Sequence, residues 1–428
     1  MKTLLISFNN FIGIIGILFF QITCSVIPNI DNEIHQTQFQ FLTGLDVLIE
    51  NNFLELKGKR VGLITNQTGL DQGLTQNVDI FDESDNVELK AIFSPEHGLF
   101  GSVSAGEKIE SDDGLTSGIP VYSLYGSTRK PTKAMLDGID ILLYDIQDTG
   151  IRSYTYISTM GLAMEAAAEQ GLEFMVLDRP NPMGLEKIEG NVLDMRFSSF
   201  IGQYPIPYVY GLTCGELANM INECEWLESD KCDLTIIKMK NYDRGLLMDQ
   251  LEQRWVPTSP HVPELRTPGY MVATGILGEL GVFSNGVGYT TPFMTMAAPW
   301  VHAETMTEHM NALKLEGVMF RPIRYKPYYA SYEGVDIGGV QIHITNFDKV
   351  DLMEIQFYFL QEHHNLYPDK NPFEMAADKQ IEMFDRALGT DRIRKIFSRN
   401  FKVKDIQDEL INGLDDYNTL STQYHLYD

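Results

Sequence analysis

"VELKAIFSPEHGLFG", residues 87–101, joins an apolar segment to a polar turn, and this combination recurs along the first half of the chain. The segment up to Phe93 is short and apolar, as expected of a buried strand. Glu96 and His97 follow in a turn that also contains one proline and two glycines. A single polar strand end is more often an ordinary turn than part of a site. The neighbouring strands decide between these two interpretations.

Strand-like and helix-like segments alternate from residue 41 to about residue 240. The other strand-like segments are KRVGLITNQTG, IPVYSLYG, IDILLYDIQDTGIR, EFMVLDRPNP and CDLTIIKM. YTYISTMGLAMEAAAEQG and TCGELANMINECEWL have apolar residues at helical spacing, and the second begins with Thr213 and Glu216 in a capping-box pattern. Short apolar strands that alternate with helices predict an α/β fold, a doubly wound parallel sheet with helices on both faces.

Four of these strands end in clusters of polar side chains. The clusters are Asn66, Gln67 and Thr68; Glu96 and His97; Asp145, Gln147, Asp148 and Arg152; and Asp178, Arg179 and Asn181. In open α/β sheets, ligands bind outside the carboxyl ends of the strands. Four polar strand ends in succession therefore predict a binding or catalytic site.

The composition and the motifs limit the chemistry of this site. The segment ITNQTGL has one glycine where a dinucleotide fingerprint needs three, and neither a GxxxxGKS loop nor a GxSxG elbow is present. We therefore expect no nucleotide cofactor, and no other cofactor or metal is called for. The net charge of −26, from 33 basic and 59 acidic residues, disfavours nucleic-acid binding.

Carboxylates beside amides and tyrosines suit a sugar, whose hydroxyls need both donors and acceptors. Tyr122, Tyr154 and Tyr156 supply aromatic faces near the strand ends. Glycoside hydrolysis also needs a carboxyl group that gives a proton to the leaving oxygen. Arg152 and Arg179 suit a carboxylate on the ligand, and internal ion pairs with Asp148 or Asp178 are an equally good explanation.

The N-terminus has the pattern of a secretory signal peptide. Lys2 precedes the apolar run FIGIIGILFF, and Cys24 follows soon after. We expect a signal peptide with a lipobox at 1–24, a polar tether at 25–40, and an exported protein. It would be periplasmic or anchored to a membrane by a lipid on Cys24. The residues QIT before Cys24 depart from the usual lipobox, so plain secretion is the alternative.

The second half of the chain predicts a smaller α+β domain. GVDIGGVQIHITN alternates as a strand, and LMEIQFYFLQEHHNLYP is typical of a helix that covers it. Cys224 and Cys232 bracket a short polar segment, and these two thiols either form a disulfide or stay reduced.

Several motifs resemble, in order, those of the exo-β-N-acetylmuramidase family of the NamZ type. They are FSPEHGLFG, GIPVYSLYG, DILLYDIQDTGIRSYTYISTM, FMVLDRPNPMG and SSFIGQYPIPYVYGLTCGELA, and the similarity continues through SPHVPELRTPGYM and GVGYTTPF to the terminal LYD. The resemblance implies a Rossmann-like catalytic domain at 41–250 and a C-terminal auxiliary domain at 251–428 that closes a cleft. It implies exo-lytic release of N-acetylmuramic acid from the non-reducing ends of peptidoglycan fragments.

The resemblance also implies which residues form the site. Glu96 is the leading catalytic carboxylate, with His97 beside it. As a glycosidase, the protein would use Glu96 as the proton donor, and a second carboxylate (Asp145, Asp148 or Asp178) or the substrate's own acetamido group would assist at the anomeric carbon. The expected substrate-binding residues are Asn66, Gln147, Arg152, Tyr154, Tyr156, Arg179 and Asn181. Many family members have an acidic residue and an arginine where this chain has Asn285 and Val287, so the end group that it recognises can differ.

Two other functions fit the same residues. A non-catalytic lipoprotein that binds muropeptides would use the same arginines and tyrosines. A metal-dependent hydrolase would hold a hard cation with Glu96, His97, Asp145 and Asp178. The first hypothesis remains a glycosidase that acts on fragments containing N-acetylmuramic acid and N-acetylglucosamine.

Overall fold

The structure, a computed structural model, describes residues 40–103, 118–251 and 253–428. The predicted signal peptide at 1–24 lies outside the described residues, as does the predicted tether at 25–40 except for Gln40. Within the described ranges, no helix combines the length and the apolar character that crossing a bilayer requires.

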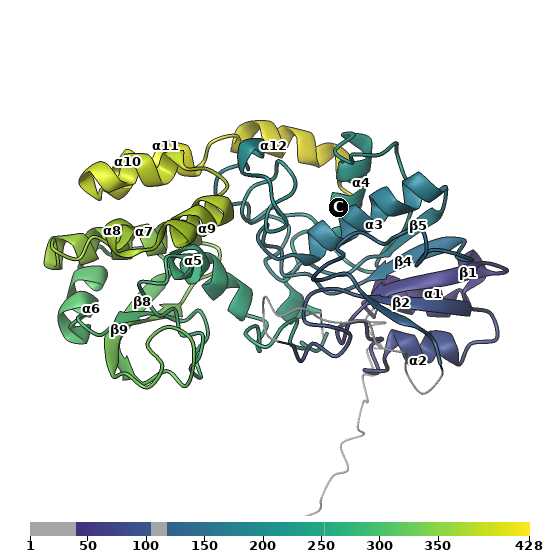
Figure 1. Ribbon diagram of the computed structural model, residues 1–428, viewed down its shortest axis with the longest axis horizontal. Coiled ribbons are helices and arrows are strands. Elements are labelled where there is room, and N and C mark those ends of the chain that lie inside the picture. The colour runs from purple at the N-terminus through teal and green to yellow at the C-terminus, as the bar shows by residue number, and fades with distance from the viewer. Residues whose placement is uncertain (1–39, 104–117, 252) are drawn as a thin grey trace, which may run out of the picture. The chain divides into compact units, whose positions relative to one another are not determined.

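Six strands of the first half form one parallel sheet (Figure 1). Its order is β3-β2-β1-β4-β5-β6. The strands are β1 (Arg60–Thr65), β2 (Glu88–Ser94), β3 (Val121–Ser123), β4 (Ile141–Asp145), β5 (Glu173–Leu177) and β6 (Asp233–Ile237). The order reverses between β1 and β4, as in a Rossmann-like sheet. The predicted doubly wound α/β fold is confirmed.

The central strand β4 shows why the sheet is covered on both faces. Ile141 and Leu143 pack in the same apolar cluster as helices α1 (Gly44–Glu50) and α2 (Asn77–Asp82). Leu142 and Tyr144 point the other way and join the cluster of α3 (Tyr156–Gln170) and α4 (Cys214–Glu223). All four side chains are fully buried, and each of the three aliphatic ones contributes roughly 1.5–3 kcal/mol relative to exposure.

The predicted helix boundaries rest on identifiable caps. Thr213 Oγ1 accepts a hydrogen bond from the backbone N–H of Glu216, and the Glu216 carboxylate accepts one from the backbone N–H of Thr213. This pair is the capping box expected for α4. Helix α3 ends at Gly171, whose φ of 66° is the left-handed conformation that glycine adopts without strain.

A smaller antiparallel sheet forms the second half, with the order β7-β9-β8. Its strands are β7 (Thr295–Ala298), β8 (Val318–Tyr325) and β9 (Ile337–Ile344). Val340 and Ile342 of β9 share a buried cluster with Phe357 and Leu360 of α7 (Leu352–Leu366). The predicted α+β C-terminal domain is confirmed.

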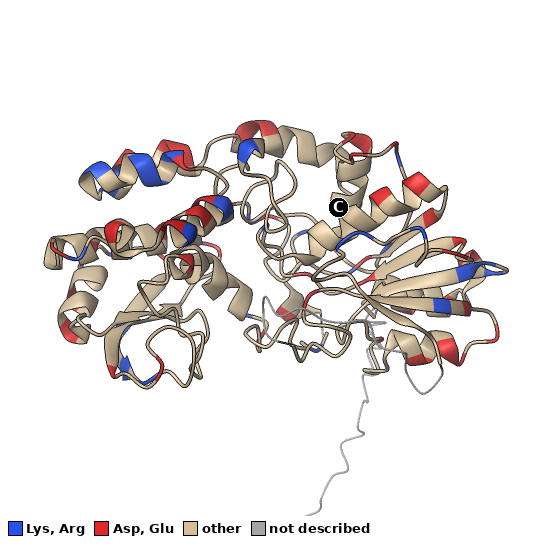
Figure 2. Cartoon of the chain, in the orientation of Figure 1, with Lys and Arg blue, Asp and Glu red and all other residues tan. Residues whose placement is uncertain are grey.

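The remaining helices of the second half are mostly short. They are α5 (Thr267–Glu279), α6 (Ala303–Ala312), α8 (Pro372–Met375), α9 (Asp378–Leu388), α10 (Arg392–Asn400), α11 (Gln407–Leu410) and α12 (Leu414–Ser421). The 3-10 turns are η1 (Leu54–Leu56), η2 (Met195–Phe197), η3 (Met248–Gln250), η4 (Val403–Asp405) and η5 (Thr422–Tyr424). Figure 2 marks acidic residues in red on many of these elements and several basic residues in blue on α10.

Loops that follow the parallel strands join the two halves. Ile151, Met183, Tyr208 and Val209 belong to the same buried cluster as α5 and α7. Because these loops are anchored in the core of the second half, the carboxyl end of the parallel sheet lies beside helices from far along the chain.

Candidate active site

A cavity of about 730 Å³ lies where the strand-end loops meet helices α5 and α9. The first half contributes Glu96, His97, Tyr125, Arg129, Tyr154, Thr155 and Phe200, and the second half contributes His261, Met271, Glu279, Met383 and Arg386. Cavities of this size commonly hold small-molecule ligands.

Glu96 and His97 enter the cavity from the turn after β2. His97 has a φ of 72°, in the left-handed region, which costs a residue other than glycine about 1–2 kcal/mol. Its Nδ1 lies 2.7 Å from the carbonyl oxygen of Val103. Because a carbonyl only accepts, Nδ1 donates in this hydrogen bond, which sets the orientation of Nε2 on the other side of the ring.

The carboxylate of Glu96 accepts a hydrogen bond from Thr155. The distance from Thr155 Oγ1 to Glu96 Oε2 is 2.8 Å, and both residues are buried. Thr155 immediately precedes α3, yet its side chain does not cap that helix. The hydroxyl instead fixes the orientation of Glu96, at the end of a helix where negative charge is favourable.

Asp145 and Arg179 form a buried ion pair and do not line the cavity. Arg179 Nε lies 2.6 Å from Asp145 Oδ1, and Nη2 lies 3.0 Å from Oδ2. Asn77 donates a further hydrogen bond of 2.7 Å to Asp145. Arg179 therefore forms an internal ion pair, but its partner is Asp145 and not Asp148 or Asp178, the partners expected from the sequence.

Asp178 serves as an anchor for two distant segments. Its carboxylate accepts hydrogen bonds from Thr213 Oγ1 at 2.7 Å and from the N–H of Gly215 at 2.8 Å, both at the start of α4. Tyr427 donates a third at 2.6 Å from the C-terminal tail. Burial raises the pKa of Asp178 to about 6. Asp178 does not line the cavity.

Arg152 is fully buried and also lies away from the cavity lining. Its guanidinium donates to four carbonyl oxygens, of Asn191, Ile206, Ala387 and Leu388. The last two are the final carbonyls of α9, which have no partner within the helix. Burial lowers the pKa of Arg152 to about 10. Arg152 was expected to bind substrate. It instead fastens α9 to the first half.

The remaining predicted residues mostly hold loops together. Asn66 accepts from Thr68, Gln147 donates to Asp148 and Pro180, Asn181 donates to Leu212, and Tyr156 donates to Thr258. None of these four predicted residues is among those that line the cavity. Tyr154 does line it, and its hydroxyl donates to Thr258 Oγ1 at 2.9 Å.

The cavity contains two arginines that the sequence did not single out. Arg129 lies over the ring of Phe200, 4.2 Å from its centroid, a cation–π contact. Arg386 reaches the cavity from α9, where it pairs with Glu382 one turn earlier. Neither follows a strand directly, and α9 approaches the first half only through tertiary packing, so no local sequence signal indicates them.

The metal hypothesis needs four residues around one ion. The structure separates them, because Asp145 and Asp178 are bound to other partners while Glu96 and His97 line the cavity. Within the described ranges, no group of three or more His, Cys, Asp or Glu side chains is placed to share a metal ion.

The other predictions concern cysteines and the glycine-rich segment. Cys224 and Cys232 are free thiols, and Cys224 Sγ lies 3.3 Å from the hydroxyl of Tyr424. The side chain of Asn285 accepts a hydrogen bond of 3.3 Å from the backbone N–H of Val287. Neither residue of that pair lines the cavity.

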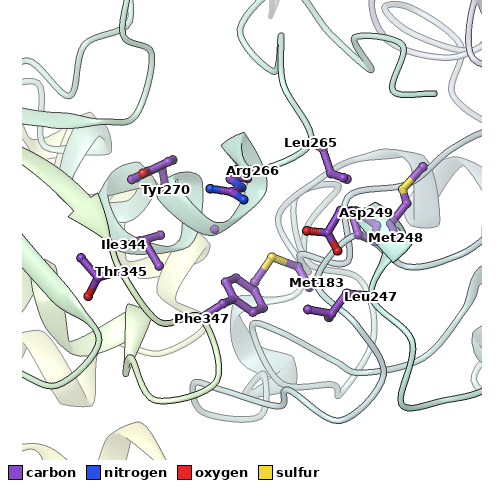
Figure 3. A pocket seen from close by; sticks show the side chains of 12 residues that line it. Met183, Leu247, Met248, Asp249, Leu265, Arg266, Tyr270, Ile344, Thr345 and Phe347 are labelled. Carbon is purple, nitrogen blue, oxygen red and sulfur yellow. The ribbon is translucent and has the colours of Figure 1, made fainter. Parts of the chain in front are cut away.

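A second cavity of about 180 Å³ also lies between the two halves (Figure 3). Apolar side chains such as Met183, Leu247 and Phe347 dominate its lining, with Asp249 and Arg266 as the charged residues. It contains none of the predicted catalytic residues, so the larger cavity is the candidate active site.

Comparisons with known proteins identify the family. The model of the N-terminal domain of exo-β-N-acetylmuramidase NamZ matches residues 61–266, and the model of its C-terminal domain matches residues 270–427. The peptidoglycan β-N-acetylmuramidase NamZ of Bacillus subtilis (strain 168) is 39% identical over 385 residues, which are 90% of this chain and 91% of that protein.

Two solved structures from Bacteroides fragilis NCTC 9343 have the same fold. Both are DUF1343 family proteins, and in each comparison 91% of this chain and 99% of the other chain are covered. One is 49% identical with a TM-score of 0.86, and the other is 28% identical with a TM-score of 0.70. The chain belongs to the NamZ family of exo-β-N-acetylmuramidases.

Proposed function

We propose that this protein is an exo-acting β-N-acetylmuramidase that releases N-acetylmuramic acid from the non-reducing ends of peptidoglycan fragments. Membership of the family and the name of the Bacillus relative support this activity. One observation carries the proposal: Glu96 and two arginines line the same cavity. The Glu96 carboxylate accepts a hydrogen bond from Thr155.

Glu96 is the leading catalytic carboxyl group at the scissile bond. The hydrogen bond from Thr155 fixes its orientation, and a turn anchored at the end of β2 fixes its position. Catalytic groups on rigid elements keep the geometry that proton transfer requires. His97 presents Nε2 to a sugar hydroxyl, because Nδ1 is bound to Val103.

Arg129 and Arg386 recognise the lactyl carboxylate, the group that distinguishes N-acetylmuramic acid from N-acetylglucosamine. Both arginines line the cavity, one from each half of the chain. In a protein with a net charge of −26, such a pair favours an anionic ligand over a neutral one. The aromatic rings of Tyr125, Tyr154 and Phe200 give the same cavity apolar faces that suit a sugar ring.

The experiment compares hydrolysis of an aryl β-N-acetylmuramide with that of the matching N-acetylglucosaminide. The protein should release the aryl group only from the muramide, with or without a chelator, and Glu96→Gln should lose this activity. If neither substrate is cleaved while muropeptides bind, the protein is the non-catalytic binding lipoprotein instead.

Export is a further part of the proposal. The signal-peptide pattern before Cys24 supports secretion, with a lipid on Cys24 as the membrane anchor and the periplasm as the location. Labelling cells with a radioactive fatty acid tests this directly. The wild type should carry label and Cys24→Ala should not; an unlabelled wild type found in the soluble exported fraction would instead indicate plain secretion.

A further inference from the structure

The active-site cavity contains a second carboxyl group, Glu279. Among the described residues that line the cavity, Glu96 and Glu279 are the two with carboxyl side chains. They come from different halves, since Glu96 follows β2 whereas Glu279 is the last residue of α5. Glycosidases of both stereochemical classes generally use a pair of carboxyl groups. The earlier candidates for the second group, Asp145, Asp148 and Asp178, do not line the cavity.

The position of Glu279 has no structural explanation. The C-terminal end of a helix carries partial negative charge, so a carboxylate there is unfavourable. Within the described ranges, Glu279 makes no hydrogen bond and no ion pair. Burial raises its pKa. A partly buried acidic residue without a hydrogen-bond or ion-pair partner, at the unfavourable end of a helix and inside a cleft, is typical of a catalytic site.

The surroundings of Glu96 favour a negatively charged carboxylate, in contrast to those of Glu279. Its carboxylate accepts a hydrogen bond from Thr155, beside the N-terminal end of α3. Negative charge is favourable at that end of a helix. Two carboxyl groups in contrasting environments divide the roles of acid and base between them.

We propose that Glu279 is the catalytic proton donor and that Glu96 is the carboxylate that acts at the anomeric carbon. This assignment rests on the proposed muramidase function. The carboxyl proton of Glu279 passes to the glycosidic oxygen as the bond from that oxygen to the anomeric carbon breaks. The electron pair of that bond leaves with the oxygen. Glu96 takes a proton from the water whose oxygen bonds to the anomeric carbon, so one water is consumed.

The test compares two leaving groups. Glu279→Gln and Glu96→Gln are assayed on the disaccharide of N-acetylmuramic acid and N-acetylglucosamine and on a 2,4-dinitrophenyl β-N-acetylmuramide. The dinitrophenolate leaves without a proton, so loss of the acid affects it little. We expect kcat of Glu279→Gln to fall by about 10²–10⁴-fold on the disaccharide, and far less on the dinitrophenyl substrate. The basic limb of its pH profile should disappear. Glu96→Gln should lose activity on both substrates.

Glu354→Gln is a matched control, because Glu354 is a partly buried acid of α7 whose pKa is raised by burial and which does not line the cavity. It should keep full activity. Equal losses on both substrates by Glu279→Gln, or none on the disaccharide, would overturn the assignment even if the wild type is an active muramidase. Inactivity of the wild type on both substrates would instead refute the proposed function. The thermal midpoint of each variant separates misfolding from chemistry.

Discussion

Replacing Arg152 by methionine tests whether a buried arginine near the active site is structural. Its guanidinium donates to Asn191 at 2.7 Å, Ile206 at 2.8 Å, Ala387 at 3.2 Å and Leu388 at 2.8 Å. Methionine fills much of the same volume but leaves four carbonyl oxygens without donors. We therefore expect thermodynamic destabilisation and little direct effect on substrate binding.

The size of the expected destabilisation follows from the number of hydrogen bonds that the Arg152 guanidinium makes. Hydrogen bonds that involve a charged group contribute about 1.5–3 kcal/mol each, but water partly satisfies the freed carbonyls and the variant no longer buries a charge. Breaking a comparable buried charged contact costs about 3–5 kcal/mol. For a chain of this size, that corresponds to a fall of roughly 4–6 °C in the thermal midpoint.

The assay is differential scanning fluorimetry with steady-state kinetics on the aryl muramide. Arg152→Met should have a lower midpoint and an almost unchanged KM for the folded fraction. Arg399→Met, at an exposed arginine of α10, is the control and should match the wild type. A normal midpoint together with a large rise in KM would show that Arg152 binds substrate and that our interpretation is wrong.

Gly389→Ala gives an independent check of the same contact. Gly389 has a φ of 78°, and an added Cβ would lie 2.6 Å from Arg152 Nη2. This variant should lower the midpoint as well, and combining it with Arg152→Met should be less than additive, because both disturb one interaction. Full additivity of the two changes in thermal midpoint would mean that the two substitutions disturb separate contacts.

Three further predictions concern recognition, pH and the tail. Arg129→Met and Arg386→Met should each lower kcat/KM for the muramide by about 10- to 150-fold, the equivalent of a lost charged hydrogen bond of about 1.5–3 kcal/mol, and should not affect a substrate whose lactyl group is methyl-esterified. Burial raises the pKa of Asp148 and Asp178 to about 6, so the folded state holds protons that the unfolded state has released. The carboxyl groups have an ordinary pKa of 3.8 when unfolded, so stability should fall as pH rises from about 4 to about 6, and Asp148→Asn should flatten this slope in thermal melts. Tyr427→Phe removes a hydrogen bond to Asp178 and should cost about 1–3 kcal/mol in urea unfolding; an unchanged midpoint would contradict the anchoring role.

The α/β fold could be predicted because its signals are local. The alternation of buried side chains along β4 and the capping box at Thr213 depend on residues close together in the sequence. The polar ends of the strands were equally visible. The sequence could not reveal the direction and partner of each polar side chain. An aspartate at position 145 is compatible with an ion pair to Arg179 and equally with binding of a ligand.

The missed residues have a physical reason in common. Arg386 and Glu279 belong to helices of the second half, and they reach Glu96 only because loops of the first half are packed into that core. Each looks like an ordinary helical surface residue when read locally. Tertiary packing, which the spacing of residues does not encode directly, decides that they share a cavity.

The buried polar residues at the strand ends explain how the cavity keeps its shape. Arg152 fastens α9, which carries Arg386, to the first half. Asp178 ties the start of α4 to the C-terminal tail through Tyr427. Each charged group is costly to bury alone, so the network is stable only when every segment is in place. The polar strand ends are therefore mostly a frame, which positions the few side chains that face the ligand.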